Sequence, residues 1–134
     1  MQRDLVLRWL EQIRALLARL ILKDPDASAE LLEQQIDAAL GQVIGTSSDL
    51  IDRLDPPAAA ALLADPFRIY GYAELLTFKA GVLEARGGDP DRCQAMTGRG
   101  LALMKLALQR ADPVPADWPE RIQSIERDLG GNPG

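Results

Sequence analysis

Five Asp-Pro dipeptides are distributed along the chain and limit where its helices can start and stop. Proline disfavours helical geometry at the residue before it and has no N–H to donate inside a helix. Between the dipeptides, apolar residues recur at the three- and four-residue spacing of a helix, and β-branched residues nowhere alternate with polar ones. The pattern argues against a sheet and predicts an all-α fold. The dipeptides are Asp24-Pro25, Asp55-Pro56, Asp65-Pro66, Asp89-Pro90 and Asp112-Pro113.

The spacing predicts five main helices with one or two short ones between them, arranged as helical hairpins. An Asp just before a helix is a favoured cap, because its carboxylate accepts a hydrogen bond from the first turn. We expect residues 1–129 to form one domain and residues 130–134 to form a flexible tail. The main helices are predicted at 2–23, 27–44, 67–86, 89–111 and 116–129, the short ones at 49–54 and 55–64, and the caps at Asp26, Asp55, Asp65 and Asp89.

The composition excludes several kinds of chemistry. The sequence has no His, which removes His-based acid–base catalysis and every His-containing zinc site. Its single cysteine, Cys93, lies on the apolar stripe of a predicted helix with Met96 and Gly100, so we interpret it as a packing residue. A net charge of −5 argues against nucleic acid as a partner. We therefore expect no catalytic residue, no cofactor and no metal.

Two acidic groups and one glycine-rich stretch could suggest a site, but a structural role explains each better. The first group lacks the glycine and the spacing of a calcium loop, and the second would spread its ligands around a helix. The glycine-rich stretch follows no strand and lies inside a predicted helix, where small residues permit close helix approach. They are, in that order, Asp24, Asp26 and Glu30; Asp49, Asp52 and Asp55; and residues 97–100.

The segment 76–108 resembles a tetratricopeptide-type helical hairpin. Its first helix carries the small residue Gly81, a Gly-Gly-Asp turn follows at 87–89, and the second helix has small residues at Cys93 and Gly100. The resemblance implies two antiparallel helices with a surface between neighbouring helices that can hold a peptide.

The whole sequence is similar to a family of small uncharacterised bacterial all-helical proteins, a domain of unknown function. The similar stretches are the Arg-Asp start and Glu-Gln that follows in 3–13, the Ile-Asp-Ala-Ala-Leu sequence at 36–40, and Gly45 before a Leu-rich short helix. The similarity covers about 1–129. It implies a helical fold in a bacterial cytoplasm, and it supplies no activity and no functional residue.

The predicted helix at 2–23 has a composition suited to a surface contact. It carries five basic and two acidic side chains, and its apolar stripe, opposite a polar face, includes a tryptophan. Such a helix could lie on an anionic membrane surface, and packing within the fold or in a dimer would explain the same pattern. The stripe residues are Leu5, Trp9, Ile13, Leu16 and Leu20.

The two helices of the tetratricopeptide-like hairpin carry a set of cations on an otherwise acidic protein. In such a hairpin they could line a groove that binds an acidic peptide or the C-terminal carboxylate of another protein, although solvated arginines would show the same spacing. The candidate contacts are Lys79, Arg86, Arg92, Arg99 and Arg110.

Together these features favour a non-catalytic helical interaction module, an adaptor or assembly subunit, whose partner is a protein or an acidic peptide. The alternative is a peripheral membrane protein that uses 2–23. We also expect a homo-oligomer, because the helices at 2–23 and 67–86 carry more apolar surface than one small bundle covers. The sequence has no run of 18 apolar residues and no signal-peptide pattern, so we expect a cytoplasmic location.

Overall fold

The computed structural model of the protein describes residues 28–44 and 48–130. Of residues 39–44 and 48–49 it describes the backbone alone, and before residue 28 it describes positions 8, 11, 12, 15, 18, 19, 22, 23 and 26. Most of the predicted helix at 2–23 therefore lies outside the described residues, as does 131–134 of the predicted tail. The five candidate contacts of that helix, Leu5, Trp9, Ile13, Leu16 and Leu20, all lie outside as well.

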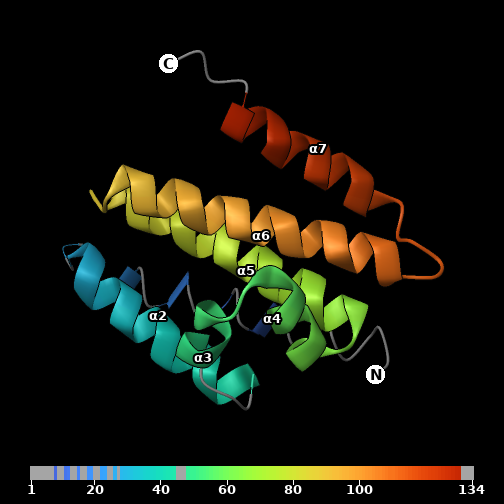
Figure 1. Cartoon of the computed structure of the whole chain (residues 1–134). Helices are drawn as coiled ribbons and strands as arrows, with labels where there is room; N and C mark the ends of the chain where they lie inside the picture. Colours follow the sequence, from blue (N-terminus) through green and yellow to red (C-terminus); the bar gives the residue numbers. More distant parts are fainter. Residues whose placement is uncertain are drawn as a thin grey trace.

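The described part of the protein is built from helices and contains no strand, which confirms the all-α prediction (Figure 1). Each helix begins and ends within two residues of its predicted bounds. The longest two, α5 and α6, are the pair predicted to resemble a tetratricopeptide hairpin. The helices are α2 (Ala29–Ile44), α3 (Ser48–Arg53), α4 (Pro56–Leu63), α5 (Pro66–Ala85), α6 (Pro90–Arg110) and α7 (Asp117–Gly130).

Three of the four predicted caps start helices in the structure. Each is an Asp followed by Pro in the first turn, and each carboxylate accepts a hydrogen bond from an N–H of that turn. Asp55 accepts from Ala58 N at 2.8 Å, Asp65 from Phe67 N at 2.8 Å, and Asp89 from Asp91 N at 3.1 Å.

The fourth cap prediction, Asp26 for the helix at 27–44, is wrong. Ser28 takes this role, because its Oγ accepts a hydrogen bond from the Leu31 N–H at 3.2 Å and its carbonyl accepts one from Leu32 at 3.0 Å. A serine immediately before the first helical residue is as good a cap as Asp, and Asp26 lies too early in the sequence to cap this turn.

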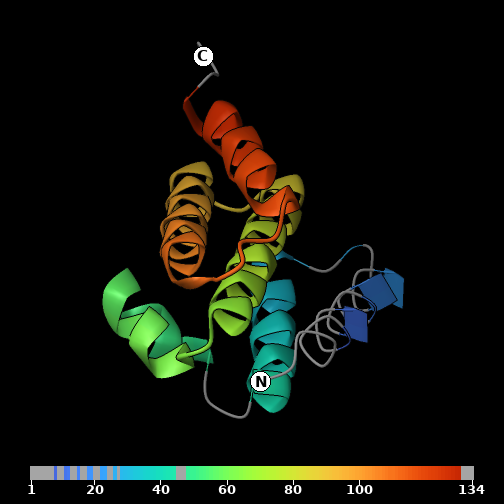
Figure 2. The same cartoon turned by 90° about the vertical axis from the view of Figure 1, so that its right-hand side faces the viewer.

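The α5–α6 hairpin forms the centre of the molecule. In Figure 1, α7 lies on one side of the pair, and α2, α3 and α4 lie on the other; Figure 2 shows the same order from the side. Helix α5 contacts α2, α4 and α6, so it packs against neighbours on more than one side.

Helix α5 buries almost all of its apolar surface within one copy of the protein. Ten of its residues are buried, and Phe78 is its one exposed large apolar side chain. We predicted that this helix would leave apolar surface for a second copy. For α5 that premise is wrong, because packing against α2, α4 and α6 covers it.

A short turn fixes α5 and α6 as an antiparallel pair. Gly87 adopts a positive φ of 81°, which L-residues with a side chain rarely adopt. The Gly88 N–H bonds to the Leu83 carbonyl at 2.8 Å and the Gly87 N–H to the Glu84 carbonyl at 3.1 Å, which is the Schellman pattern that ends a helix. The Asp89 cap then starts α6 directly.

Only one of the two glycines inside α6 serves close packing in the described structure. A Cβ on Gly100 would lie 2.8 Å from Thr77 Cγ2 and 3.1 Å from the Ala73 carbonyl oxygen, so α6 approaches the backbone of α5 here. A Cβ on Gly98 would meet no described atom within 4 Å, and the same holds for Gly81. The prediction of close approach is therefore confirmed at Gly100 and wrong at Gly98.

Helix α7 docks through one buried aromatic residue. The Trp118 ring stacks on Tyr70 with centroids 4.2 Å apart and an interplanar angle of 4°, and it meets the edge of Phe67 at 5.3 Å. Beside this cluster, Arg121 Nε donates to Glu74 Oε1 at 2.8 Å. The polar pair fixes the register of α7, whereas the ring cluster removes apolar surface from water.

Candidate functional site

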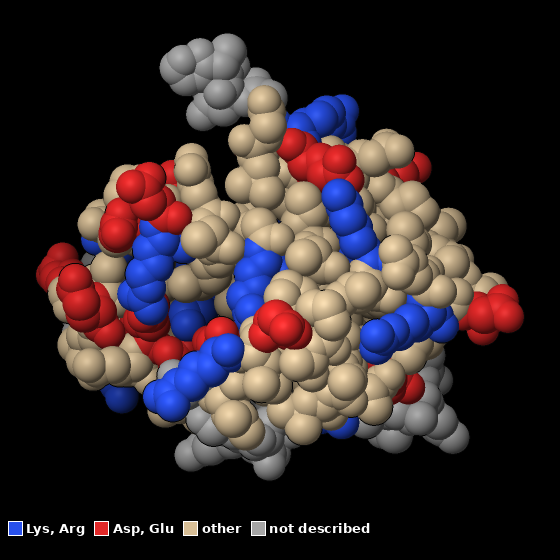
Figure 3. Space-filling model, in the orientation of Figure 1, with Lys and Arg blue, Asp and Glu red and all other residues tan. Residues whose placement is uncertain are grey.

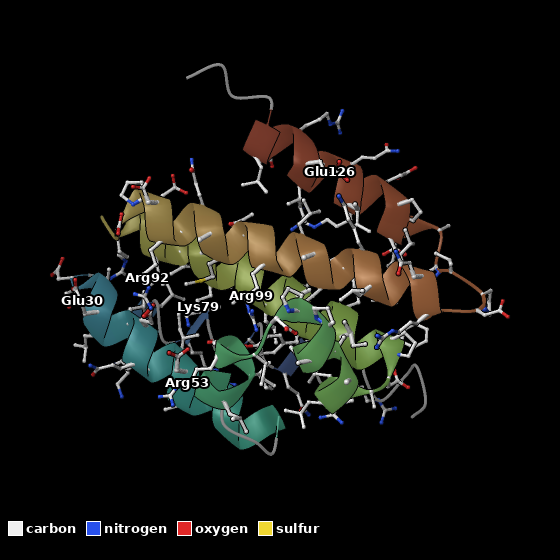
Figure 4. All side chains as sticks on the ribbon, in the orientation of Figure 1. Glu30, Arg53, Lys79, Arg92, Arg99 and Glu126 are labelled. Carbon is white, nitrogen blue, oxygen red and sulfur yellow. The ribbon has the colours of Figure 1, made fainter. Side chains whose placement is uncertain are left out.

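Charged side chains converge where α2 and α3 meet the α5–α6 hairpin. Figure 4 shows Lys79, Arg92 and Arg99 reaching from the hairpin toward α2 and α3, and in Figure 3 basic and acidic groups lie against one another in this region. We call this set the charged seam. It consists of Glu33 and Asp37 on α2, Asp52 on α3, Tyr72 and Lys79 on α5, and Arg92 and Arg99 on α6.

An apolar layer lies beneath the charged seam. Leu32 and Ile36 on α2, and Ile51 on α3, are fully buried in the core that the hairpin shares with them. Leu32 and Ile36 are four residues apart, so they lie on one face of α2 and each precedes a seam carboxylate in the sequence. The apolar spacing of α2 therefore positions Glu33 and Asp37 at the edge of its buried face.

Lys79 is the buried centre of the seam. Its side chain is 3% exposed, and its Nζ lies 2.6 Å from Asp37 Oδ1, whose side chain is 35% exposed. Burial raises the pKa of the Asp37 carboxyl above its ordinary value, and the hydrogen bond and charge of Lys79 oppose this rise. The buried ammonium of Lys79 is thus neutralised by Asp37, whose ionised form is itself partly disfavoured by burial.

The Arg92–Glu33 pair is asymmetric. Arg92 Nη2 bonds to Glu33 Oε1, with the arginine side chain 62% exposed and the glutamate side chain 13% exposed. The other carboxylate oxygen, Glu33 Oε2, is buried and has no hydrogen-bond partner among the described residues. A buried acceptor without a donor costs free energy, so this pair leaves the seam incompletely satisfied.

Tyr72 and Asp52 join α5 to α3. The Tyr72 hydroxyl donates to Asp52 Oδ1. Burial first, and then the charge and hydrogen bond of Asp52, raise the pKa of Tyr72 far above its ordinary value. The phenol therefore stays protonated and acts as a fixed donor, which suits a structural or recognition role.

Arg99 binds the backbone of α3. Its Nη2 donates to the Ile51 carbonyl oxygen at 2.5 Å, which places a cation at the C-terminal turn of this short helix, where the backbone carbonyls favour positive charge. The Arg99 Nε is buried, and no described residue accepts a hydrogen bond from it. The hairpin therefore offers one more donor than α2 and α3 use.

The seam is electrically balanced. Its three carboxylates all come from the α2–α3 side, and its three cations all come from the hairpin. These contacts hold α2 and α3 in register on the hairpin.

The five cations that we predicted to line one peptide-binding groove do not lie together in the structure. Lys79, Arg92 and Arg99 meet in the seam, but α2 and α3 occupy the face that we expected an external peptide to occupy. Arg86 is half-buried at the C-terminal cap of α5, and Arg110 is exposed in the last turn of α6, at the far end of the hairpin. The prediction of a single open groove is therefore wrong. Helices α2 and α3 of the protein itself cover this face of the hairpin.

Cys93 sits beside a small pocket at the turn end of the hairpin. The pocket has a volume of about 90 Å³ and is lined by residues of α2, α5, α6 and the turn, among them Glu33 and Arg92. Burial raises the pKa of the Cys93 thiol, so the thiol stays protonated and packs against its neighbours, in agreement with its interpretation as a packing residue. Pockets that hold drug-sized ligands are several times larger.

Neither a metal site nor a membrane span is found in the described part of the protein. Within the described ranges, no three Asp, Glu or Cys side chains come together as metal ligands could. Across 28–44 and 48–130, no helix has the length and apolar character that crossing a bilayer requires.

The described positions of the predicted helix at 2–23 are helical and exposed. They include the charged residues Arg8, Glu11, Arg19 and Lys23. Leu22, next to Lys23 in the sequence, is also strongly exposed.

Sequence reasoning found the cations of the seam and missed the carboxylates. Glu33 and Asp37 looked like ordinary polar residues, Asp52 was considered only as part of the acidic group with Asp49 and Asp55, and Tyr72 looked like part of an apolar stripe. One signal was present: Leu32-Glu33 and Ile36-Asp37 repeat an apolar–acidic pair after four residues, which places both acids beside the buried face of α2.

Comparisons with protein-family models, with curated proteins and with solved structures gave no match for this protein.

Proposed function

We propose that this protein is a non-catalytic, tetratricopeptide-like interaction module whose α5–α6 hairpin recognises acidic helical segments of other proteins. The observation that carries the proposal is that the hairpin holds such a segment within the protein itself. Helix α2 lies against it with Glu33 on Arg92 and Asp37 on Lys79.

The contact follows a known mode of helix recognition. An amphipathic helix binds a groove through apolar anchors one turn apart, and charged groups at the rim select the partner. Leu32 and Ile36 are the anchors of α2, and the two acid–base pairs lie beside them, one on the buried Lys79 and the other on the exposed Arg92. The basic residues belong to the hairpin, so an acidic helix is the matching partner.

The remaining features agree with a module that binds instead of reacting. Lys79 and Arg92 are paired with carboxylates of α2, the Cys93 thiol is buried and protonated, and the pocket near it is too small for an ordinary cofactor. We place this module in the cytoplasm of a bacterium, as the sequence resemblance implies.

A peripheral membrane role is the second candidate, favoured by one observation. Leu22 is exposed near Arg19 and Lys23 on the same helix, an apolar side chain between cations. Such a surface suits an anionic bilayer. Sedimentation with vesicles of anionic lipid, compared between wild type and Leu22→Ser, tests it: equal sedimentation of the two would remove this candidate.

Affinity capture with cross-linking mass spectrometry tests the interaction function. The tagged full-length protein serves as bait in a lysate of the source organism, alongside Arg92→Glu and a control, Arg127→Glu, in an exposed turn of α7 far from the seam. We expect proteins that cross-link to α6 through an acidic helix, retained by Arg127→Glu and reduced at least fivefold by Arg92→Glu. Capture that ignores Arg92→Glu, or no capture, would reject the proposal.

A further inference from the structure

Helix α2 meets the hairpin as a bound peptide helix would. Its described contacts with the hairpin are two fully buried apolar side chains, Leu32 and Ile36, and two ion pairs beside them. The partners in these pairs lie 42 and 59 residues away in the sequence, so α2 reaches the hairpin across a long stretch of sequence and not as its immediate neighbour.

The fit of α2 and α3 to the hairpin is incomplete. Glu33 Oε2 and Arg99 Nε are both buried without a partner among the described residues, one on each side of the seam. Arg99 directs its Nη2 to a backbone carbonyl, and no carboxylate of the described parts of α2 and α3 bonds to it. A ligand with a further acceptor at this level would satisfy a donor that the present occupant leaves unused.

The ion pairs of the seam contribute little net stability, so they select the occupant of the face more than they hold it there. Burying two charges costs about as much as their attraction returns, so such pairs specify register more than they stabilise. The raised pKa of Asp37 agrees with this, since burial disfavours its ionised form even beside Lys79. The apolar contact of α7 with the hairpin, by contrast, is built around the Trp118–Tyr70 stack, which involves no residue of α2.

We propose that α2 is a built-in occupant of the helix-binding face of the hairpin, and that the partner of this protein is an acidic amphipathic helix that takes its place. This inference rests on the proposed interaction function and adds the chemistry of the partner and its regulation. The partner helix carries two apolar side chains four residues apart, each followed by a carboxylate, and a further carboxylate one or two turns on that reaches Arg99.

The arrangement makes the module self-inhibited. A segment tethered within the same molecule acts at an effective concentration in the millimolar range, so it competes with any partner in solution. The partner must therefore bind the hairpin more tightly than α2 does, or bind when α2 is weakened. Substitutions on α2 that loosen it leave the hairpin face unchanged and should then increase binding of the partner, whereas a substitution on the hairpin, such as Arg92→Glu, removes a contact that the partner itself needs.

Binding of a labelled peptide with the sequence of residues 28–44 tests this directly. Fluorescence anisotropy measures its affinity for three full-length proteins: wild type, the release variant Glu33→Lys/Asp37→Lys, and the control Gln34→Lys/Ala38→Lys. The control places lysines at the same spacing on the exposed side of α2. We expect the release variant to bind the peptide at least tenfold more tightly than wild type, and the control to match wild type.

A second experiment, in which the charges of the Arg92–Glu33 pair are exchanged, tests the inference even if the release variant does not fold. In the Arg92→Glu variant, the wild-type peptide should bind at least tenfold more weakly than a peptide carrying Glu33→Arg, because the exchanged pair restores the attraction. Hydrogen exchange in α6 and α7 reports whether the core of each variant is intact. A folded core together with this reversal of preference supports the proposal even if the release variant is unstable.

Three outcomes would overturn the inference. The first is equal binding of the peptide by the release and control variants, and the second is a charge exchange that leaves the preference unchanged. The third is a concentration-dependent dimer mass for the release variant with no peptide binding, which would assign the face to a second copy. If these occur while Arg92-dependent capture from the lysate persists, the interaction function stands and only the role of α2 is wrong.

Discussion

The molecule holds its helices together in two different ways, and the contrast lies on either side of the α5–α6 hairpin. On the α7 side, Trp118 stacks on Tyr70 and the nearby ion pair lies at the edge of the contact. On the α2–α3 side, Leu32, Ile36 and Ile51 are also buried, but a row of charged pairs lies across the contact, with two buried atoms that no described residue satisfies.

The difference separates stability from selectivity. Apolar burial contributes about 25 cal/mol per Å² whatever the exact partner, so the α7 side stabilises the fold with modest demands on geometry. Charged pairs return little net free energy but penalise a partner of the wrong sign by several kcal/mol or so. A surface of the second kind is suited to choosing between partners.

Replacing Trp118 by Ala should give the largest effect, because it disrupts the apolar contact between α7 and the hairpin. The change removes a buried ring that stacks on Tyr70, so we expect a loss of about 3–5 kcal/mol in the free energy of unfolding. Urea titration followed by circular dichroism measures this loss. Trp118→Phe is the matched control and should cost much less, because a ring remains against Tyr70; equal losses would contradict the role of the stack.

Removing the buried cation tests the seam. Lys79→Met leaves Asp37 without this partner, and we expect a loss of about 2–3 kcal/mol, concentrated in α2 and α3. The double variant Lys79→Met/Asp37→Leu replaces both charges by apolar groups and should regain most of it. Hydrogen exchange resolved by helix measures both. A double variant as unstable as the single one would mean that the ion pair stabilises the fold outright.

Two glycines in α6 sharpen the contrast between close packing and open surface. Gly100→Ala puts a Cβ 2.8 Å from Thr77 Cγ2, so we expect a loss of about 1–2 kcal/mol. Gly98→Ala meets no described atom within 4 Å and should gain about 0.5–1 kcal/mol, because alanine is the better helix former. Thermal unfolding compares the two. Thr77→Ser removes the contacting methyl group and should rescue part of the Gly100→Ala loss.

The pH dependence of Asp37 gives the smallest effect. Since burial raises its pKa above the ordinary 3.8, the folded protein binds this proton more readily than the unfolded protein. Its favourable contribution is therefore present at low pH and is lost as pH rises through the folded-state pKa. In urea titrations, the stability of wild type relative to Asp37→Asn should fall from about pH 3.8, the ordinary pKa, toward neutrality. A relative stability that rises with pH would show that Lys79 outweighs burial.

Most of the fold could be predicted because its signals are local. Asp55, Asp65 and Asp89 each stand directly before a proline and the turn that they cap, so a few residues determine where α4, α5 and α6 begin. Cys93 and its apolar stripe were likewise visible from helical spacing alone. Asp26 was mistaken for a cap because Ser28, two residues on, competes for the same role.

The seam could not be predicted because it depends on long-range packing. The spacing of Arg92 and Lys79 shows that they share a region of the hairpin, but it does not show which helix covers that region. Their partners Glu33 and Asp37 are 59 and 42 residues away, and periodicity carries no information at that distance. Glycines 98 and 100 illustrate the same limit: they look alike in sequence, and only the position of α5 tells them apart.

The long sequence separations within the seam have a consequence during synthesis of the protein. Arg92 follows Glu33 by 59 residues, so at about 5–20 residues per second the ribosome delivers it roughly 3–12 s later. Helix α2 is thus made well before the hairpin that it binds, and during this interval Leu32 and Ile36 have no hairpin to pack against. The tethered α2 is already present when the hairpin emerges, and until then the nascent chain exposes two apolar side chains that the finished molecule buries.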